Sequence, residues 1–198
     1  MVIVVFFFVG KAMAQRKWGL LDAKSGWFVS GAIGAGTYVG DADGFRRKGE
    51  RISIGGDAAV GKWLTPALAL RLQMGGYNMQ GARLDKQKNT GVKESWNYGF
   101  VHGDVMIDAM TLFGGVKEDR FYSFIPYAGL GKGLHTGGDK NACTGLTVGA
   151  VNKFRLSGHM DAIIELKGII FPDRFDWVSG GRGKDGAAHL TAGFTYNF

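Results

Sequence analysis

The sequence predicts an all-β protein whose eight antiparallel strands close into an up-and-down transmembrane β-barrel. Three observations support this fold class. From residue 27 onward apolar and polar residues alternate, 34 of the 198 residues are glycine, and the chain ends in an aromatic-rich strand. Alternation indicates strands with two different faces, and a high glycine content favours strands and turns over long helices.

The first residues have the pattern of a secretory signal. Residues 1–9 form a short apolar run, and Ala12-Met13-Ala14 supplies the small residues of a cleavage site. We therefore expect a signal peptide over 1–14, a lead-in over 15–26 and the barrel over 27–198. The competing interpretation of residues 1–9 is a buried strand. A spanning helix needs roughly 20 apolar residues, and the sequence has no such run.

Charge and cysteine content limit the partners and cofactors. The net charge of +7 favours an anionic partner: nucleic acid, lipid headgroups or acidic polysaccharide. Export from the cytoplasm argues against nucleic acid. Because Cys143 is the only cysteine, neither an intramolecular disulfide nor a cysteine-rich metal site is expected, and we expect no cofactor.

The alternation is clearest over residues 68–74. There Leu70 and Leu72 share one face while Arg71 and Gln73 share the other. Residues 51–60 and 100–108 repeat this pattern. In a soluble sandwich the apolar face would form the core and the polar face would meet water, whereas in a membrane barrel the apolar face would contact lipid and the polar face would fill the interior.

The last strand favours the membrane alternative. It places Leu190, Phe194, Tyr196 and Phe198 on one face, and an aromatic residue ends the chain. An exposed apolar edge promotes aggregation unless it pairs with another strand, and pairing with the first strand would close the barrel. Phe194, Tyr196 and Phe198 have the pattern of the terminal signal that the outer-membrane barrel assembly machinery reads.

Eight segments carry the strand pattern, an even number as in bacterial single-chain barrels. Their ranges are 27–38, 51–64, 67–77, 96–110, 121–132, 142–154, 159–170 and 187–198. We expect long polar loops at 39–50, 80–95 and 171–186, a shorter one at 137–141, and tighter connections at 65–66, 111–120 and 155–158. With both termini in the periplasm, the long loops would lie outside the cell.

Aromatic residues concentrate near the ends of these segments, as in the aromatic girdles of membrane barrels. Ordinary strand propensity accounts for part of this enrichment. The residues are Trp27, Phe28, Trp63, Trp96, Tyr98, Phe121, Tyr122, Phe124, Phe154 and Tyr196.

The polar faces predict a plugged interior. An eight-stranded barrel is just wide enough for its own side chains to fill. Buried charges cost several kcal/mol each unless they are paired, so we expect a network of ion pairs and hydrogen bonds. Its expected members are Asp57, Arg71, Gln73, His102, Asp104, Asp108, Glu165, Lys167 and His189.

Catalysis and metal binding are the weaker interpretations of the same residues. His102 and Asp104 share a face, but no Ser or Cys nucleophile stands out near them. The four histidines lack the spacing of metal ligands. They are His102, His135, His159 and His189.

Basic residues cluster in the expected outer loops. Such clusters could bind lipopolysaccharide phosphates or acidic glycans through contacts that salt weakens. Solvated loop charges with no fixed partner are the alternative. The residues are Arg46, Arg47, Lys48, Arg51, Arg83, Lys86, Lys88, Lys93, Arg174, Arg182 and Lys184.

Several stretches resemble the OmpA-like outer-membrane barrels, particularly their Bacteroidetes branch. They span 102–106, 112–115, 120–131 and 152–157, with Asp161 and Glu165, and the Phe-x-Pro-Tyr-x-Gly-x-Gly pattern at 124–131 is the most specific. The resemblance implies an eight-stranded barrel in the outer membrane. Many such proteins carry a peptidoglycan-binding domain after the barrel. Here the sequence ends with the last strand, so barrel-only proteins of the OmpX kind are the closer comparison.

These observations favour a non-enzymatic outer-membrane protein that supports envelope integrity and makes surface contacts through its loops. Its expected partners are outer-membrane lipid, lipopolysaccharide, the assembly machinery, and a surface ligand or other envelope proteins. A narrow, porin-like passive pore is the second hypothesis. A secreted soluble barrel that binds a small ligand is the third.

Overall fold

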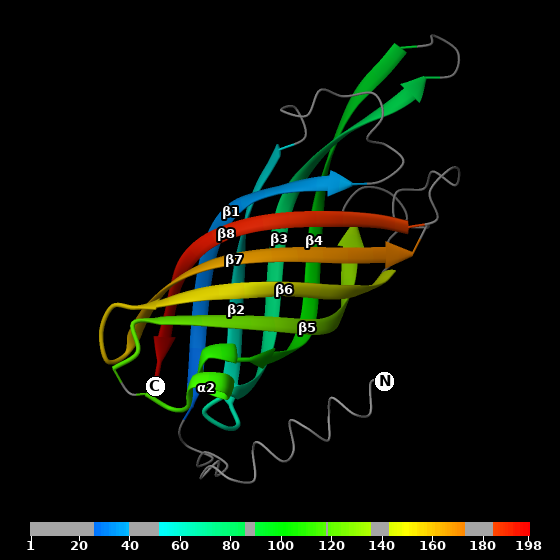
Figure 1. Cartoon of the computed structure of the whole chain (residues 1–198). Coiled ribbons are helices and arrows are strands. Elements are labelled where there is room, and N and C mark those ends of the chain that lie inside the picture. Colours follow the sequence, from blue (N-terminus) through cyan, green and yellow to red (C-terminus); the bar gives the residue numbers. More distant parts are fainter. Residues whose placement is uncertain (1–25, 40–51, 86–89, 118, 136–142, 173–183) are drawn as a thin grey trace.

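The computed structural model describes residues 26–39, 52–85, 90–117, 119–135, 143–172 and 184–198. Strands adjacent in sequence pair antiparallel, and β8 pairs with β1, which closes the barrel (Figure 1). This confirms the predicted fold class. The strands are β1 (Trp27–Val39), β2 (Ile52–Trp63), β3 (Leu68–Asp85), β4 (Thr90–Ile107), β5 (Tyr122–His135), β6 (Cys143–Arg155), β7 (Met160–Pro172) and β8 (Lys184–Asn197).

The two faces of the wall have opposite polarity. On β3, Leu70 and Leu72 are 47% and 51% exposed, whereas Arg71 between them is 4% exposed. On the other strands, too, the outward side chains are mostly apolar, and the buried charged side chains point inward. The exposed set includes Ile33, Ile54, Val101, Val105, Leu130, Leu146, Val148, Ile164, Leu166, Ile170 and Leu190.

β3 and β4 extend well beyond the barrel wall. β2 pairs with β3 only as far as Tyr77, and β4 pairs with β5 only from Tyr98. Between these points the residues at 78–85 pair with those at 90–97 and, within the described chain, with no other strand. They form a two-stranded ribbon, which projects at the upper end in Figure 1. The expectation of a loop was therefore wrong for residues 80–85 and 90–95, while residues 86–89 lie outside the described residues.

A short helix, α2 (Ala109–Gly114), follows β4. The Asp108 carboxylate accepts hydrogen bonds from the Thr111 amide at 2.9 Å and the Thr111 hydroxyl at 3.0 Å. An aspartate in this position stabilises the first turn of a helix, so β4 ends at Ile107 rather than at Met110 as expected. Among the described residues no helix is both long and apolar enough to cross a membrane.

We call the end of the barrel where β1 begins and β8 ends the terminal end. The lumen near this end is filled by apolar side chains, which we call the apolar layer. Sequence reasoning predicted only polar residues inside and missed this layer. Its members are Phe28, Ala32, Ala69, Met106, Ile125, Tyr127, Val151 and Ile163, with Trp63 partly buried against them.

The aromatic girdle is only partly as expected. Trp27, Phe121 and Tyr196 are exposed on the outside of the molecule. Phe28 lies inside, because alternation places it on the face opposite to Trp27, and Trp63 packs against the apolar layer. Three further members, Tyr122, Phe124 and Phe154, are partly exposed, and the side chains of Trp96 and Tyr98 lie outside the described set.

Candidate functional site

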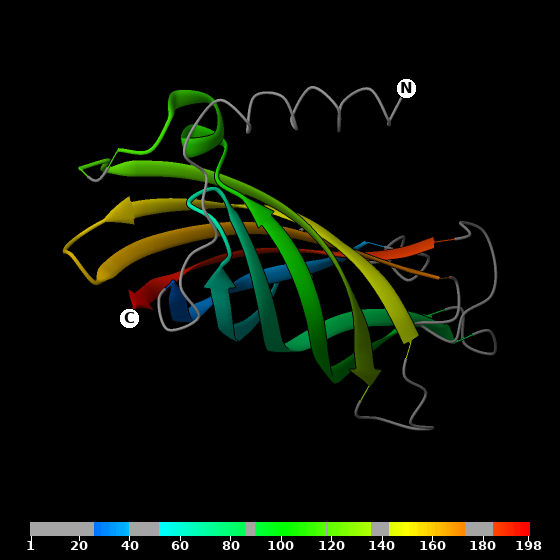
Figure 2. The ribbon, with the colours of Figure 1, turned by 90° about the horizontal axis from the view of Figure 1, so that it is seen from below.

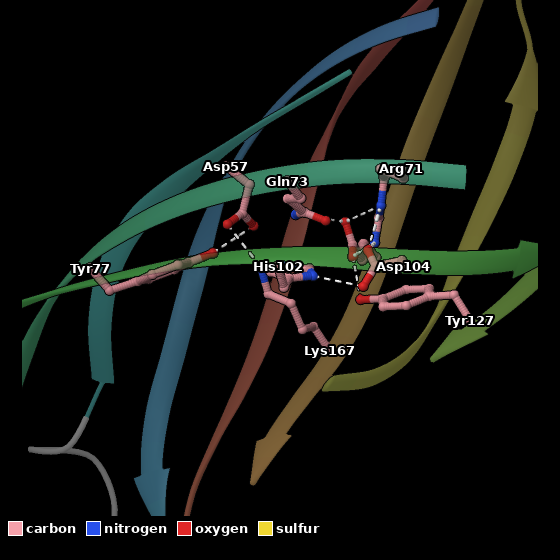
Figure 3. Close-up of polar contacts among 9 residues, drawn as sticks. Asp57, Arg71, Gln73, Tyr77, His102, Asp104, Tyr127 and Lys167 are labelled. Atoms are coloured by element: carbon pink, nitrogen blue, oxygen red, sulfur yellow. Dashed lines mark hydrogen bonds and ion pairs between the residues drawn. The ribbon is translucent and has the colours of Figure 1, made fainter. Parts of the chain in front are cut away.

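Arg71 is the centre of a buried polar network in the lumen (Figure 3). Its Nε donates to Asp104 Oδ2 at 2.9 Å, and its Nη2 lies 2.8 Å from the same oxygen. On the other side, Nη2 and Nη1 donate to the two oxygens of Glu165 at 2.9 and 3.3 Å. The guanidinium also lies 4.4 Å from the centre of the Tyr127 ring. One cation thus joins carboxylates from β4 and β7 across the barrel.

Three further groups extend this cluster. The Tyr127 hydroxyl donates to Glu165 Oε1, and Gln73 Nε2 donates to Glu165 Oε2 at 3.4 Å. His102 Nδ1 lies 2.7 Å from Asp104 Oδ1. Glu165 therefore has hydrogen-bond partners from both β3 and β5, which fix the carboxylate in place.

A second cluster surrounds Asp57 on β2. Lys167 Nζ donates to Asp57 Oδ1 at 2.8 Å, and the Tyr77 hydroxyl donates to Asp57 Oδ2 at 2.7 Å. The His189 ring lies against the Tyr77 ring at 4.1 Å between centroids. Tyr77 and Tyr127 were missing from the predicted network. The alternation on β3 could have placed Tyr77 inside, because it shares the face of Arg71 and Gln73.

The two clusters are close to charge balance. Asp57, Asp104 and Glu165 supply three carboxylates, and Arg71 and Lys167 supply two cations whose side chains are 2% exposed. Ions so deeply buried are stable only when they are paired and hydrogen-bonded, so the arrangement fills and rigidifies the lumen.

Glycines on neighbouring strands make room for these side chains. A Cβ atom on Gly129 would lie 2.1 Å from Asp104 Oδ1, and one on Gly75 would lie 2.1 Å from Asp57 Oδ1. A Cβ on Gly149 would likewise lie 2.5 Å from the Tyr127 hydroxyl. Large inward side chains thus alternate with glycine across the wall, which lets a narrow barrel hold so many of them.

Several buried polar atoms make no hydrogen bond to the described residues. Water is a suitable partner for such atoms, so this part of the lumen is chemically suited to hold internal water. The atoms are Ser53 Oγ, Gln73 Oε1, His102 Nε2, Thr147 Oγ1, both ring nitrogens of His189, and Thr191 Oγ1.

The structure brings most of the expected lumen residues together, with one correction. Asp57, Arg71, Gln73, His102, Asp104, Glu165, Lys167 and His189 are all buried inside the wall. Asp108 is buried too, but its carboxylate caps α2 through Thr111, because the chain turns into the helix there. The expectation that Asp108 belongs to the lumen network was therefore wrong.

Those of the other predicted residues that the structure describes lie at the two ends of the molecule. Phe194, Tyr196 and Phe198 are 57%, 45% and 66% exposed near the terminal end. Arg83 and Lys93 lie on the ribbon of β3 and β4, and Lys184 begins β8. The remaining basic candidates lie outside the described residues, as do residues 1–14. They are Arg46, Arg47, Lys48, Arg51, Lys86, Lys88, Arg174 and Arg182.

Neither catalytic nor metal chemistry is evident in the described part. No group of three or more His, Cys, Asp or Glu side chains there is arranged to hold a metal ion. His102 and Asp104 form a hydrogen-bonded pair, but neither side chain has any exposed surface. A substrate from solution could not reach this pair without a large rearrangement of the lumen.

Comparison with known proteins identifies related sequences and folds. The chain is 33% identical to outer membrane protein 40 of Porphyromonas gingivalis over 94% of its own length and 52% of that protein. It is 30% identical to outer membrane protein 41 of the same organism over 78% of its length and 39% of that protein. The chain thus spans about half the length, or less, of these curated relatives. No family model matches.

Solved structures share the barrel fold at low sequence identity. Neisserial surface protein A aligns with a TM-score of 0.59 at 11% identity, covering 88% of this chain and 98% of that one. The outer membrane protein OprG of Pseudomonas aeruginosa aligns with a TM-score of 0.55 at 10% identity, covering 88% and 96%.

Proposed function

Since this chain is an outer-membrane β-barrel protein homologous to outer membrane proteins 40 and 41 of Porphyromonas gingivalis, we propose that it is a non-enzymatic scaffold of that membrane. Its wall anchors the protein in lipid, and its lumen is plugged. The segments beyond the wall make surface contacts, and the protein contributes to envelope integrity. The observation that carries this proposal is the closure of the lumen by two layers of side chains.

The apolar layer and the charged network each oppose conduction. Phe28, Ile125, Val151 and Ile163 are all 2–4% exposed, so little space remains between them. Above them, Arg71 is fixed between Asp104 and Glu165 by hydrogen bonds on both sides. An ion would have to cross an apolar constriction after disrupting buried ion pairs, and each step is unfavourable.

Single-channel recording in planar bilayers tests this closure. The purified barrel should give no reproducible conductance steps. The variant with Ile125→Ala and Ile163→Ala removes side chains from the apolar layer, and Leu166→Ala on the outer face is its control. Reproducible steps from the wild-type protein would favour the narrow passive pore and overturn the plugged scaffold.

Surface contact is assigned to the end opposite the terminal end. We place the termini in the periplasm, so the ribbon formed by residues 78–85 and 90–97 projects from the cell (Figure 1). The ribbon and the connection between its strands contain four of the basic candidates, Arg83, Lys86, Lys88 and Lys93, against two acidic residues, Asp85 and Glu94. This excess favours lipopolysaccharide phosphates or acidic glycans as partners.

Binding to immobilised lipopolysaccharide at several salt concentrations tests this contact. Two variants neutralise the basic candidates, one with Arg83→Gln and Lys93→Gln, the other with Arg46, Arg47 and Lys48 all changed to Gln. Both should bind more weakly and with a shallower dependence on salt. Lys62→Gln, close to the terminal end, should bind like the wild type. Unchanged binding by both neutralised variants would remove lipopolysaccharide from the proposal.

A further inference from the structure

At the terminal end of β5 the strand pairs with only one of its two neighbours. Pairing between β4 and β5 stops at Met106 and Tyr127, whereas β5 continues to pair with β6 as far as Tyr122 and Phe154. Residues 122–126 of β5 thus have no partner among the described residues of β4. Helix α2 contacts β5 and lies beside this end of it (Figure 1, Figure 2). The helix covers a strand edge that would otherwise be open.

Helix α2 has one buried face and one exposed face. Thr111 is buried and bonded to Asp108, whose amide donates to the Ala67 carbonyl at 2.8 Å, so this side of the helix faces the barrel. Met110 is 39% exposed and Phe113 is 80% exposed. Two more apolar side chains continue the exposed face after the helix, and we call the four residues the α2 patch. They are Met110, Phe113, Val116 and Phe121.

The α2 patch is continuous with the lipid-facing side of the wall. The Phe121 ring lies 6.0 Å from the Phe154 ring, which lies 5.3 Å from the Tyr122 ring. Phe154 shares the outward face of β6 with Leu146 and Val148. Apolar side chains therefore extend from the wall to this aromatic cluster at the start of β5, next to the segment that contains α2, with Asn152 as a polar residue on the same outward face of β6.

Charged side chains border the α2 patch. Lys117 is exposed next to Val116, and Asp119 is exposed two residues later. Arg120 Nη2 donates to the Gly115 carbonyl at 2.6 Å, which holds the connection in a compact turn. Exposed aromatic and aliphatic side chains beside lysine and arginine are typical of segments that lie in the interface of a membrane.

We propose that the α2 patch inserts into the boundary between headgroups and acyl chains in the leaflet at the terminal end. Its partner is the phospholipid surface itself. The segment then acts as an interfacial foot. It fixes the depth of the barrel on the side where the pairing between β4 and β5 stops before the end of β5. This inference depends on the outer-membrane location but not on whether the lumen conducts.

Depth-dependent fluorescence quenching tests the foot. Cys143→Ser removes the only native thiol, so a single cysteine can be introduced and labelled with a polarity-sensitive dye. The test position is Phe113→Cys. Leu166→Cys on the outer wall is the lipid-facing control, and Gly158→Cys, where a Cβ meets nothing within 4 Å, is the control in the turn between β6 and β7. Each protein is folded into phosphatidylethanolamine and phosphatidylglycerol vesicles.

Lipids brominated near the headgroup should quench the Phe113 label more strongly than lipids brominated deep in the chain, and the Leu166 label should show the reverse order. Aqueous iodide should quench the Gly158 label most. A Phe113 label that iodide quenches like the Gly158 label would overturn the proposal and favour a periplasmic protein as the partner of the patch. If Phe113→Cys gives no heat-modifiable folded band, Val116→Cys tests the same surface.

Discussion

Replacement of Arg71 by methionine removes the cation that Asp104 and Glu165 share and keeps an unbranched side chain of moderate length. The three side chains are at most 2% exposed, and Arg71 donates to both carboxylates. Removal of one partner from a buried ion pair costs about 3–5 kcal/mol, because the remaining charge is left uncompensated. Here two carboxylates lose their cation. We expect the free energy of unfolding to fall by at least about 3 kcal/mol, roughly a 100-fold change in the unfolding equilibrium.

A triple variant separates the loss of pairing from the loss of side-chain volume. In Arg71→Met with Asp104→Asn and Glu165→Gln, no uncompensated charge of this cluster remains. Replacement of a whole buried ion cluster is often close to neutral, so the triple variant should be more stable than Arg71→Met alone. Asp119→Asn, which removes an exposed charge outside the strands of the wall, should change stability by no more than about 0.5 kcal/mol.

Equilibrium urea unfolding in lipid vesicles measures these differences. The five tryptophans report unfolding by fluorescence, and the heat-modifiable electrophoretic band confirms that each variant has folded. A loss below about 1 kcal/mol for Arg71→Met would contradict the reasoning, since that is the range of exposed pairs. A triple variant less stable than the single one would contradict it equally.

Three more perturbations follow from the same structure. Gly129→Ala puts a Cβ 2.1 Å from a carboxylate oxygen and 2.3 Å from a backbone oxygen, so it should lower the free energy of unfolding in urea by about 1–3 kcal/mol. Its control is Gly103→Ala, whose Cβ meets nothing closer than 4.0 Å and which should leave the stability unchanged. Lys167→Met leaves the Asp57 carboxylate without its cation and should cost about 3–5 kcal/mol; the added change Asp57→Asn should restore part of that loss, and no restoration would count against the pair. Leu166→Arg places a charge on the lipid face and should cost about 2–4 kcal/mol in bilayers, while an equal stability of Leu166→Arg and wild type would argue against lipid contact.

The alternation predicted the barrel well because the polarity of the two faces can be read from each strand by itself. Arg71 between Leu70 and Leu72 already shows two faces of opposite polarity, and eight such segments with an apolar last strand require closure. The closed barrel confirms the strand number and the fold class.

Three features were not predicted from the sequence: the apolar layer, the ribbon of β3 and β4, and helix α2. The apolar layer forms because Phe28, Met106 and Ile163 reach the same level of the lumen, which the register sets and a single strand does not reveal. The ribbon of β3 and β4 extends beyond the wall and pairs with no other described strand. Its sequence lacks an apolar face and therefore resembles a loop. α2 escaped notice because six residues are too few for a helical period, and Asp108 fitted the strand alternation.

The central claim is that the leucines of the wall contact lipid while the charges are enclosed, and spin-label accessibility measures this most directly. In the Cys143→Ser background, labels at Leu70→Cys, Leu72→Cys and Met74→Cys should collide readily with oxygen dissolved in the bilayer. They should be protected from a water-soluble nickel complex. Labels protected from both reagents would mean that these side chains pack in a protein core, and access of the nickel complex would mean that they face water; either result would contradict the account.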